Sequence, residues 1–373
     1  DRGFCRGSAC FSCSGVPCLL AEQHCSRAPV CMTLSHLSSS TPISQLPPIA
    51  DMISCTPSTQ GMGGVMFLQW AVATTVLKAA ANHAEVVSAF FCQNVCSIAG
   101  VYHPSIEVLE LASRVGQALV QRIGVLVNSS NADSEQGARL HAQHRKMIAT
   151  DAVLIMEFID GHPLLPEDAA AQAEQDELGS QVEAAAKSLG RIMAVDLTLN
   201  NWDRLPIDGF GPWRPDPAGF FAPEWPGNPD NLMRRASDGT IVAIDTDMKV
   251  HYSCPGGGTL TTDEYLRQLT PLLTRMAGDR PSELAMRVRD GLAKIRPGVW
   301  LSTEALLAFD CGFMSAFDAL AAGAGPGDGG ADAMQAAYEE AKARAGMDDE
   351  PAALHVCVER AKRVVEAWRE QPI

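Results

Sequence analysis

The sequence lacks any run of about 18 uncharged apolar residues, the length that a membrane-spanning helix needs. Positive charge is also scarce, because 29 Lys and Arg residues face 44 Asp and Glu residues, for a formal net charge of −15. A field of that sign repels nucleic-acid backbones and anionic membrane surfaces. We therefore expect no membrane span and no nucleic-acid partner. An acidic protein can still bind a phosphate ligand where metal ions neutralise the site.

An even spread of cysteines is missing too. Six of the twelve lie in the first 31 residues, and the CxxC pair of Cys10 and Cys13 is followed by no second pair at a zinc-type separation. Cys92 and Cys96 lie four positions apart in an apolar helical pattern, which is typical of buried thiols. These features favour a reducing compartment, so we expect a cytoplasmic protein.

Composition divides the chain into three parts. Residues 1–57 are rich in Cys, Ser and Pro, and we expect this segment to be poorly ordered. Residues 58–160 carry short strand patterns around helical ones and predict a small lobe. Residues 161–373 are mainly helical and predict a larger lobe with a helical C-terminal extension. This order predicts an α+β fold with two lobes.

Local patterns predict the individual elements. The apolar runs at 65–68 and 72–77 predict two paired strands, which begin a small antiparallel sheet. The remaining expectations, in chain order, are a helix over 84–100, a strand over 101–110, a helix over 113–127, a polar loop over 128–144, a buried strand over 152–158 and a long helix over 166–195.

Three polar residues after the long helix suggest metal-dependent phosphoryl transfer, which needs metal ligands and an acidic residue facing the nucleophile. Asp203 lies in NWDRLP, Asn231 in GNPDNLM, and Asp245 ends the apolar run IVAI. The 14 positions from Asn231 to Asp245 suit a hairpin with its turn at 238–239, which would bring both side chains to one metal ion. Asp203 precedes Asn231 by 28 positions, against about five in kinase catalytic loops, so we predict an insertion over 207–226.

Each of these residues also has a structural explanation. Asp203 could end a turn or, through its neighbour Arg204, belong to a structural ion pair. Asn231 could cap a turn, and Asp245 could simply terminate a strand. Asp196, on the preceding helix, is more easily explained as structural than as catalytic.

The segments GRIMAVD (190–196), NNWDRLP (200–206), GNPDN (227–231) and AIDTD (243–247) resemble the catalytic core of the actin-fragmin kinase family. The resemblance implies a two-lobed protein kinase-like fold, related to the phosphoinositide 3-kinase-like kinases, with ATP and Mg²⁺ as cofactors. It makes Asp203 the catalytic aspartate, Asn231 and Asp245 metal ligands, and Asp247 an auxiliary ligand. The tripeptide at 245–247 departs from the usual DFG.

The same resemblance implies seven ATP-binding residues in the small lobe: Gly61, Gly63, Gly64, Lys78, Glu85, Glu157 and Phe158. The glycines would cover the phosphates, Lys78 would hold the α and β phosphates, and Glu85 would pair with Lys78. The last two residues would form the hinge between the lobes. Taken alone, each of these features is weak, but they follow one another in the order that a kinase requires.

We therefore expect a kinase that transfers the γ-phosphate of ATP to a hydroxyl group. The resemblance favours a protein Ser or Thr as acceptor, with a cytoskeletal protein as one candidate substrate. Two alternatives stay open. One is a pseudokinase or adaptor that keeps the fold and binds a protein partner, which the weak glycine loop favours; the other is a lipid or small-molecule kinase.

Overall fold

The computed structural model describes residues 47–58, 65–80, 82–164, 179–210, 227–246, 248, 261–275, 279–295, 301–322, 330–347 and 352–372. All of them belong to one compact unit, residues 38–373. The predictions for Gly61, Gly63, Gly64 and Asp247, and for the segment before residue 47, lie outside the described residues.

A five-stranded antiparallel sheet in the order β1-β2-β3-β5-β4 forms the centre of the small lobe. Its strands are β1 (Ser54–Pro57), β2 (Val65–Gln69), β3 (Thr74–Ala80), β4 (Ile106–Glu110) and β5 (Ala152–Glu157). The predicted pairing of the first two apolar runs is confirmed, since β2 and β3 are antiparallel neighbours with Val65 opposite Lys78.

The end of the N-terminal segment that we predicted to be poorly ordered is instead part of this sheet. Strand β1 pairs with β2, and alternate residues Cys55 and Pro57 are buried. The short helical turn η2 (Ile49–Asp51) precedes it. The prediction failed here because a four-residue strand containing proline gives almost no strand signal.

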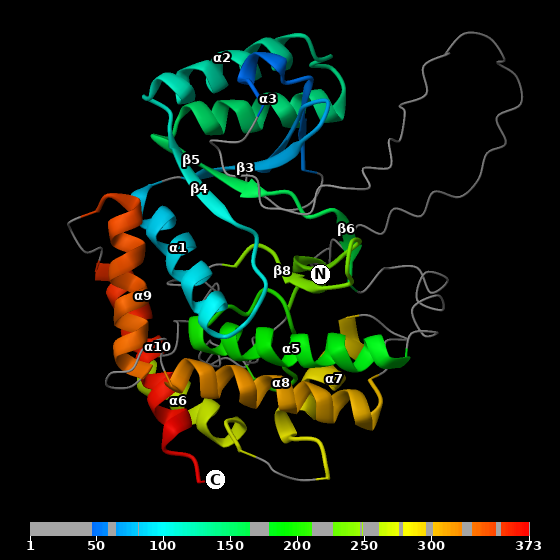
Figure 1. Cartoon of the computed structure of the whole chain (residues 1–373), viewed down its shortest axis with the longest axis vertical. Coiled ribbons are helices and arrows are strands. Elements are labelled where there is room, and N and C mark those ends of the chain that lie inside the picture. The colour runs from blue at the N-terminus through cyan, green and yellow to red at the C-terminus, as the bar shows by residue number, and fades with distance from the viewer. Residues whose placement is uncertain are drawn as a thin grey trace, which may run out of the picture. The chain divides into compact units, whose positions relative to one another are not determined.

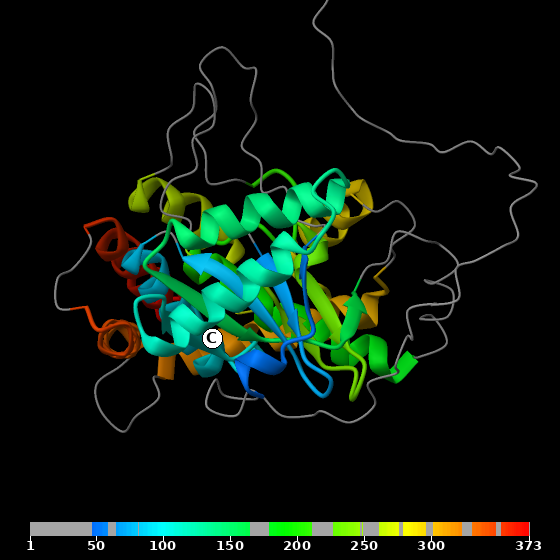
Figure 2. The same cartoon turned by 90° about the horizontal axis from the view of Figure 1, so that it is seen from above.

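Two helices, α2 (Arg114–Asn128) and α3 (Glu135–Ile148), lie across one face of the sheet (Figures 1 and 2). In α2, Leu119, Ile123 and Val127 recur every four residues and are buried. They share a core cluster with strand residues that include Leu68 and Leu77. The sheet therefore presents its opposite face, with Lys78, towards the rest of the molecule.

The prediction of a loop over 128–144 is wrong, because α3 occupies most of that range. Ser134 caps the helix by accepting a hydrogen bond from the backbone N–H of Gly137. Apart from Gly137, only Leu140 and Met147 of α3 are buried. With so few apolar contacts, the helical period is barely visible in the sequence.

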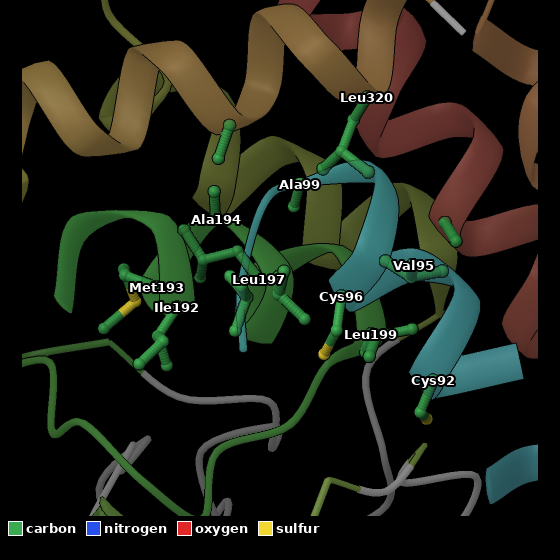
Figure 3. Packing of buried hydrophobic residues seen from close by; sticks show 14 of the residues in the cluster. Cys92, Val95, Cys96, Ala99, Ile192, Met193, Ala194, Leu197, Leu199 and Leu320 are labelled. Carbon is green, nitrogen blue, oxygen red and sulfur yellow. The ribbon is translucent and has the colours of Figure 1, made fainter. Parts of the chain in front are cut away.

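Helix α1 (His83–Ile98) links the two lobes through its packing. Its Cys92, Val95 and Cys96 are buried next to α5 (Gly179–Leu199), as Figure 3 shows. Both cysteines are free thiols, as the helical pattern predicted, and burial raises the pKa of Cys96 to about 12. Both thiols are therefore packing residues, and the raised pKa keeps Cys96 protonated at neutral pH.

A second, three-stranded sheet begins the large lobe in the order β6-β7-β8. It contains β6 (Gly161–Pro163), β7 (Leu232–Arg235) and β8 (Ile241–Ala243), with the helical turn η3 (Pro229–Asn231) before β7. The predicted hairpin is confirmed: β7 and β8 are antiparallel, and Gly239 turns the chain with a φ of 70°. Residues 158–160 connect β5 of the first sheet to β6 of the second.

The large lobe is otherwise helical. After α5 come α6 (Thr262–Leu269), the turn η4 (Thr270–Leu272), α7 (Glu283–Ile295), α8 (Thr303–Ala322), α9 (Gly330–Ala345) and α10 (Ala352–Arg369). Helices α5 and α8 pack against each other along their lengths (Figure 1). The predicted α+β, two-lobed fold is confirmed.

Helix α8 is long and apolar enough to cross a membrane by length and composition, the one such helix in the described residues. Its apolar side chains, among them Phe309, Phe313 and Phe317, are buried inside the protein. Phe317 stacks on Trp368 of α10 with ring centroids 5.0 Å apart. The hydrophobicity of α8 is thus accounted for by its place in the core.

Candidate active site

Lys78 and Asp245 come from different lobes and meet directly. The Lys78 ammonium at the end of β3 donates a hydrogen bond to Oδ1 of Asp245, with a distance of 2.6 Å. Their side chains are 28% and 45% exposed, so both groups are reachable from solvent. The structure therefore places a cation and an anion, 167 positions apart in the chain, at one accessible site.

Asn231 joins Asp203 to the same place. Its amide nitrogen donates to the backbone oxygen of Asp203 at 2.9 Å and lies 3.3 Å from the carboxylate Oδ2 of that residue. The backbone N–H of Ile244, which precedes Asp245, donates to the backbone oxygen of Asn231 at 3.0 Å. One continuous set of contacts thus links Lys78, Asp245, Asn231 and Asp203.

Backbone hydrogen bonds close the long excursion between Asp203 and Asn231. Gly227 donates to the backbone oxygen of Trp202, and Asn228 donates to that of Arg204. Gly227 has a φ of 67°, and a Cβ there would lie 2.5 Å from the backbone nitrogen of Pro206. These contacts bring the two ends of the segment together, so Asp203 and Asn231 are close in space although 28 positions separate them.

A buried ion pair fixes this loop. Arg204 and Asp196 of α5 are both fully buried, and Nε of Arg204 donates to Asp196 Oδ1 at 2.9 Å. Arg204 also donates to the Thr246 hydroxyl at 2.7 Å. Burial raises the pKa of Asp196, and the charge and hydrogen bonds of the Arg204 guanidinium oppose that rise. Arg204 thereby ties α5 and the Asp203 loop to the segment after β8.

Two residues at the site have left-handed backbone conformations, with φ of 55° for Asn200 and 51° for Asp245. Asn and Asp tolerate this region better than other residues that carry a Cβ, but they are still strained there. Such strain persists only where surrounding contacts enforce it. At Asp245 the flanking contacts of Ile244 with Asn231 and of Thr246 with Arg204 hold the backbone in place.

The segment expected to form the hinge follows β5. The Glu157 carboxylate accepts hydrogen bonds from the Tyr102 hydroxyl at 2.7 Å and from the backbone N–H of Ser105 at 3.2 Å. Phe158 is 36% exposed and packs edge-on against Phe67 of β2. The Glu157 side chain is thus used to hold the segment before β4, and the linker backbone is anchored as well, since the N–H of Ala236 donates to the backbone oxygen of Asp160 at 2.8 Å.

Glu85 is exposed in the first turn of α1, where its backbone N–H donates to the Asn82 side chain at 3.0 Å. The structure gives Asp245 as the partner of Lys78, and the pairing of Glu85 with Lys78 stays a prediction. The candidate metal ligands Asn231 and Asp245 lie on consecutive hydrogen-bonded segments, whereas Asp247 is not described.

The donor set suits a hard cation. No group of three or more His, Cys, Asp or Glu side chains that could hold a metal ion gathers anywhere in the described part of the chain. The site instead offers the Asp245 carboxylate and the Asn231 amide, whose nitrogen is used on Asp203, leaving its oxygen to face a ligand. Mg²⁺ typically takes one or two such oxygen ligands together with substrate phosphates and water.

Lys78 on a strand contacts Asp245, which follows a strand of the other lobe, and Asp203 and Asn231 lie beside them. This arrangement is that of a kinase-like protein. A comparison with protein families agrees. The family described as actin-fragmin kinase, catalytic, matches residues 36–286. The chain belongs to this family, as the resemblance predicted. A search of curated proteins found no match to the chain.

Arg204 is the functional-site residue whose importance sequence reasoning missed. The sequence suggested that Arg204 could form a structural ion pair and that Asp196 is structural, but it did not pair the two. They are eight positions apart across a helix end, a separation that no regular period favours. The contact with Thr246, 42 positions away, could not have been inferred from one sequence.

Proposed function

We propose that this chain is an ATP-dependent phosphotransferase that moves the γ-phosphate of Mg·ATP to a hydroxyl group. The observation that carries the proposal is the 2.6 Å contact between Lys78 and Asp245, together with the Asn231 and Asp203 contacts beside it. An ammonium and a carboxylate that face each other without a ligand are complementary to a phosphate and a metal cation, respectively. The residues present therefore fit the cofactors that the family implies.

The inner face of the small sheet suits the base of a nucleotide. By strand register, Val65, Phe67, Val76 and Met156 share the face that carries Lys78, and all four are half-buried. This face ends at the linker that begins with Phe158. An apolar surface with a few polar groups at its edge is a usual setting for a ligand ring such as adenine. The lysine at its end would then reach the phosphates.

The protein residues would divide the chemistry as follows. Lys78 would hold the phosphates by charge, while Asn231 and Asp245 would hold Mg²⁺. When bound, Mg·ATP supplies the transferable phosphoryl group and neutralises the charge that develops on it. Asp203 would orient the acceptor hydroxyl and take its proton. Arg204, buried behind the loop, would keep the Asp203 carboxylate in position.

We further propose a protein Ser or Thr as the acceptor, because the chain belongs to a family whose name is that of a kinase acting in the actin system. A cytoskeletal substrate and a cytoplasmic location follow from the same reasoning. A lipid or small-molecule acceptor is the alternative within the kinase class. A pseudokinase that only binds a partner is opposed by the convergence of four chemically suited side chains at one exposed site.

The test is Mg²⁺-dependent ATP turnover by the purified full chain. We expect Asp245→Ala to lower turnover by a factor of about 10² or more, because it removes a proposed metal ligand. The matched control is Asp151→Ala, which removes an exposed aspartate from the turn before β5. Turnover that survives Asp245→Ala unchanged would refute the proposed mechanism. Failure of the wild type to bind Mg·ATP would favour the adaptor.

A further inference from the structure

Helix α9 lies along α1, the helix that links the two lobes (Figure 1). The Phe91 ring of α1 packs edge-on against Tyr338 of α9, with ring centroids 5.9 Å apart, and both side chains are fully buried. The Asn94 side chain donates a hydrogen bond to the backbone oxygen of Ala337 at 2.9 Å. The two buried cysteines of α1 lie next to α5 instead, so α1 is held on two of its sides.

One arginine of α9 connects this helix to both α1 and β4. The Arg344 guanidinium carbon lies 3.9 Å from the centre of the Phe90 ring, and Nη1 donates to Oε1 of Gln93 at 3.2 Å. Its Nη2 donates to the backbone oxygen of Ile106, the first residue of β4, at 3.4 Å. A planar guanidinium can stack on a ring and donate hydrogen bonds from its edge at the same time, which a lysine ammonium cannot. Arg344 therefore fixes the position of α1 relative to β4.

Both of the elements that Arg344 contacts lead to Lys78. Helix α1 begins at His83, just after β3, which carries Lys78 and ends at Ala80. Strand β4 pairs with β5, and β5 in turn pairs with β3, where Leu154 lies opposite Lys78. A displacement of α1 against β4 would therefore move the end of β3 and the ammonium group that this strand presents to Asp245.

Helix α9 is anchored to the large lobe by the helix that follows it. Helix α10 packs against α9 and also against α5 and α8. The Trp368 indole of α10 donates to Oδ1 of Asp318 at 3.0 Å, and Nε of Arg369 donates to the backbone oxygen of Ala321 at 3.1 Å. Both helices lie beyond residue 286, where the match to the family ends. A part of the chain outside the matched segment thus connects the large lobe to α1.

We propose that Arg344 is a positioning residue of the phosphotransferase, which holds Lys78 in place for the phosphates of ATP through α1 and β4. This inference rests on the proposed function. Arg344 lies on α9 and contacts a ring, a side-chain amide and a backbone carbonyl, none of which belongs to the candidate active site. Its loss should therefore weaken the binding of Mg·ATP without removing a group that takes part in the chemical step.

The first test is the steady-state kinetics of the full chain with Mg·ATP. We expect Arg344→Gln to raise KM for Mg·ATP by about threefold or more and to leave kcat within about twofold, because Lys78 is displaced while Asp203 is not. A purely structural role would reduce the fraction of folded enzyme, and hence the apparent kcat, without raising KM. Arg344 is exposed, so its replacement leaves no buried cavity. Arg344→Lys keeps the charge but not the planar fork and should give an intermediate KM.

The matched control is Arg369→Gln, which removes an arginine that ties α10 to α8 within the large lobe and should leave KM unchanged.

The second test does not depend on turnover. Hydrogen–deuterium exchange of the backbone amides of β3 and α1 should be faster in Arg344→Gln than in the wild type or Arg369→Gln, because the contacts that hold these elements are lost. Equal exchange in all three proteins would overturn the inference, as would an unchanged KM in Arg344→Gln when the wild type is active. A wild type without turnover would refute the proposed function, and the exchange rates would then decide whether Arg344 positions β3.

Discussion

At the scale of single residues, the buried guanidinium of Arg204 connects three segments of the candidate active site. It contacts Asp196 on α5 and Thr246 after β8, and it follows Asp203 directly in the chain. Isolated buried charges are expensive, whereas paired ones can be tolerated. The Arg204–Asp196 pair therefore restricts the backbone next to Asp203, whose carboxylate would need a fixed position for catalysis.

We expect Arg204→Met to lower the free energy of unfolding by about 3–5 kcal/mol, because it leaves the Asp196 carboxylate buried without a counter-charge. The double variant Arg204→Met with Asp196→Leu should recover part of that loss, since no charge then remains buried. Urea unfolding followed by circular dichroism measures both. A free energy of unfolding for Arg204→Met within about 1 kcal/mol of the wild-type value would contradict this account.

His103 provides a pH-dependent contribution to stability. Its pKa is lowered from 6.5 to about 4, mainly by burial and in smaller part by the nearby charges of Arg204 and Lys78. As pH falls, the unfolded chain takes up this proton near 6.5 and the folded protein only near 4. Protonation between these values therefore favours unfolding, and stability rises with pH across this window.

We expect the free energy of unfolding of the wild type to fall by up to about 3 kcal/mol between pH 6.5 and 4 because of His103. Solvent screening of this partly exposed side chain reduces that figure. In His103→Gln this part of the pH dependence should disappear. The measurement is the difference between the two proteins in free energy of urea unfolding at several pH values. Parallel pH profiles would show that His103 does not titrate as proposed.

Residue type and spacing were enough to single out Asp203, Asn231 and Asp245, because each follows a recognisable strand or loop signal, and the family resemblance added Lys78. Contacts that depend on how elements pack were not predictable. The use of the Glu157 carboxylate on Tyr102 is one example, since 55 positions separate the two residues. The phosphate-covering role of the glycines and the metal-binding role of Asp247 remain predictions.

At the scale of elements, the close crossing of α5 and α8 depends on two glycines. A Cβ at Gly190 would lie 1.9 Å from the backbone oxygen of Phe309, and one at Gly312 would lie 1.9 Å from that of Lys187. Both obstacles are backbone atoms, which cannot rotate away as a side chain would. Gly190 also begins the GRIMAVD segment, so helix packing accounts for the first residue of that motif.

We expect Gly190→Ala to destabilise the protein by about 3 kcal/mol, since the two helices must separate. The matched control is Gly124→Ala within α2, where the nearest atom to a new Cβ is a His144 side-chain nitrogen at 3.7 Å. That change should be neutral or stabilise by up to about 1 kcal/mol, because alanine favours helix. Thermal unfolding distinguishes the two, and equal melting temperatures would refute the packing argument.

Elements with a strong apolar period were predicted well, and those without one were not. The strands β2, β3 and β5, the helices α1 and α2, and the β7-β8 hairpin all follow from local patterns. Helix α3 was missed because its buried face is small, and β1 because its strand is short. In both cases tertiary packing, rather than local propensity, determines the structure.

At the scale of the whole molecule, the chain assembles one site from both lobes. The small lobe supplies Lys78 and an apolar sheet face, and the large lobe supplies Asp203, Asn231 and Asp245. Residues 158–160 connect the sheets, and the packing of α1 and the 2.6 Å contact of Lys78 with Asp245 also join the lobes. A ligand bound between these two residues would replace their contact with one to phosphate and one to metal.

The central claim is that this site transfers phosphate. The most direct measurement is incorporation of label from γ-labelled ATP into a heat-inactivated cell lysate, with Mg²⁺ present, by the wild type and by Asp203→Ala. The account predicts labelled protein bands with the wild type and a reduction of about 10² or more with the variant. Equal labelling by both proteins would contradict it.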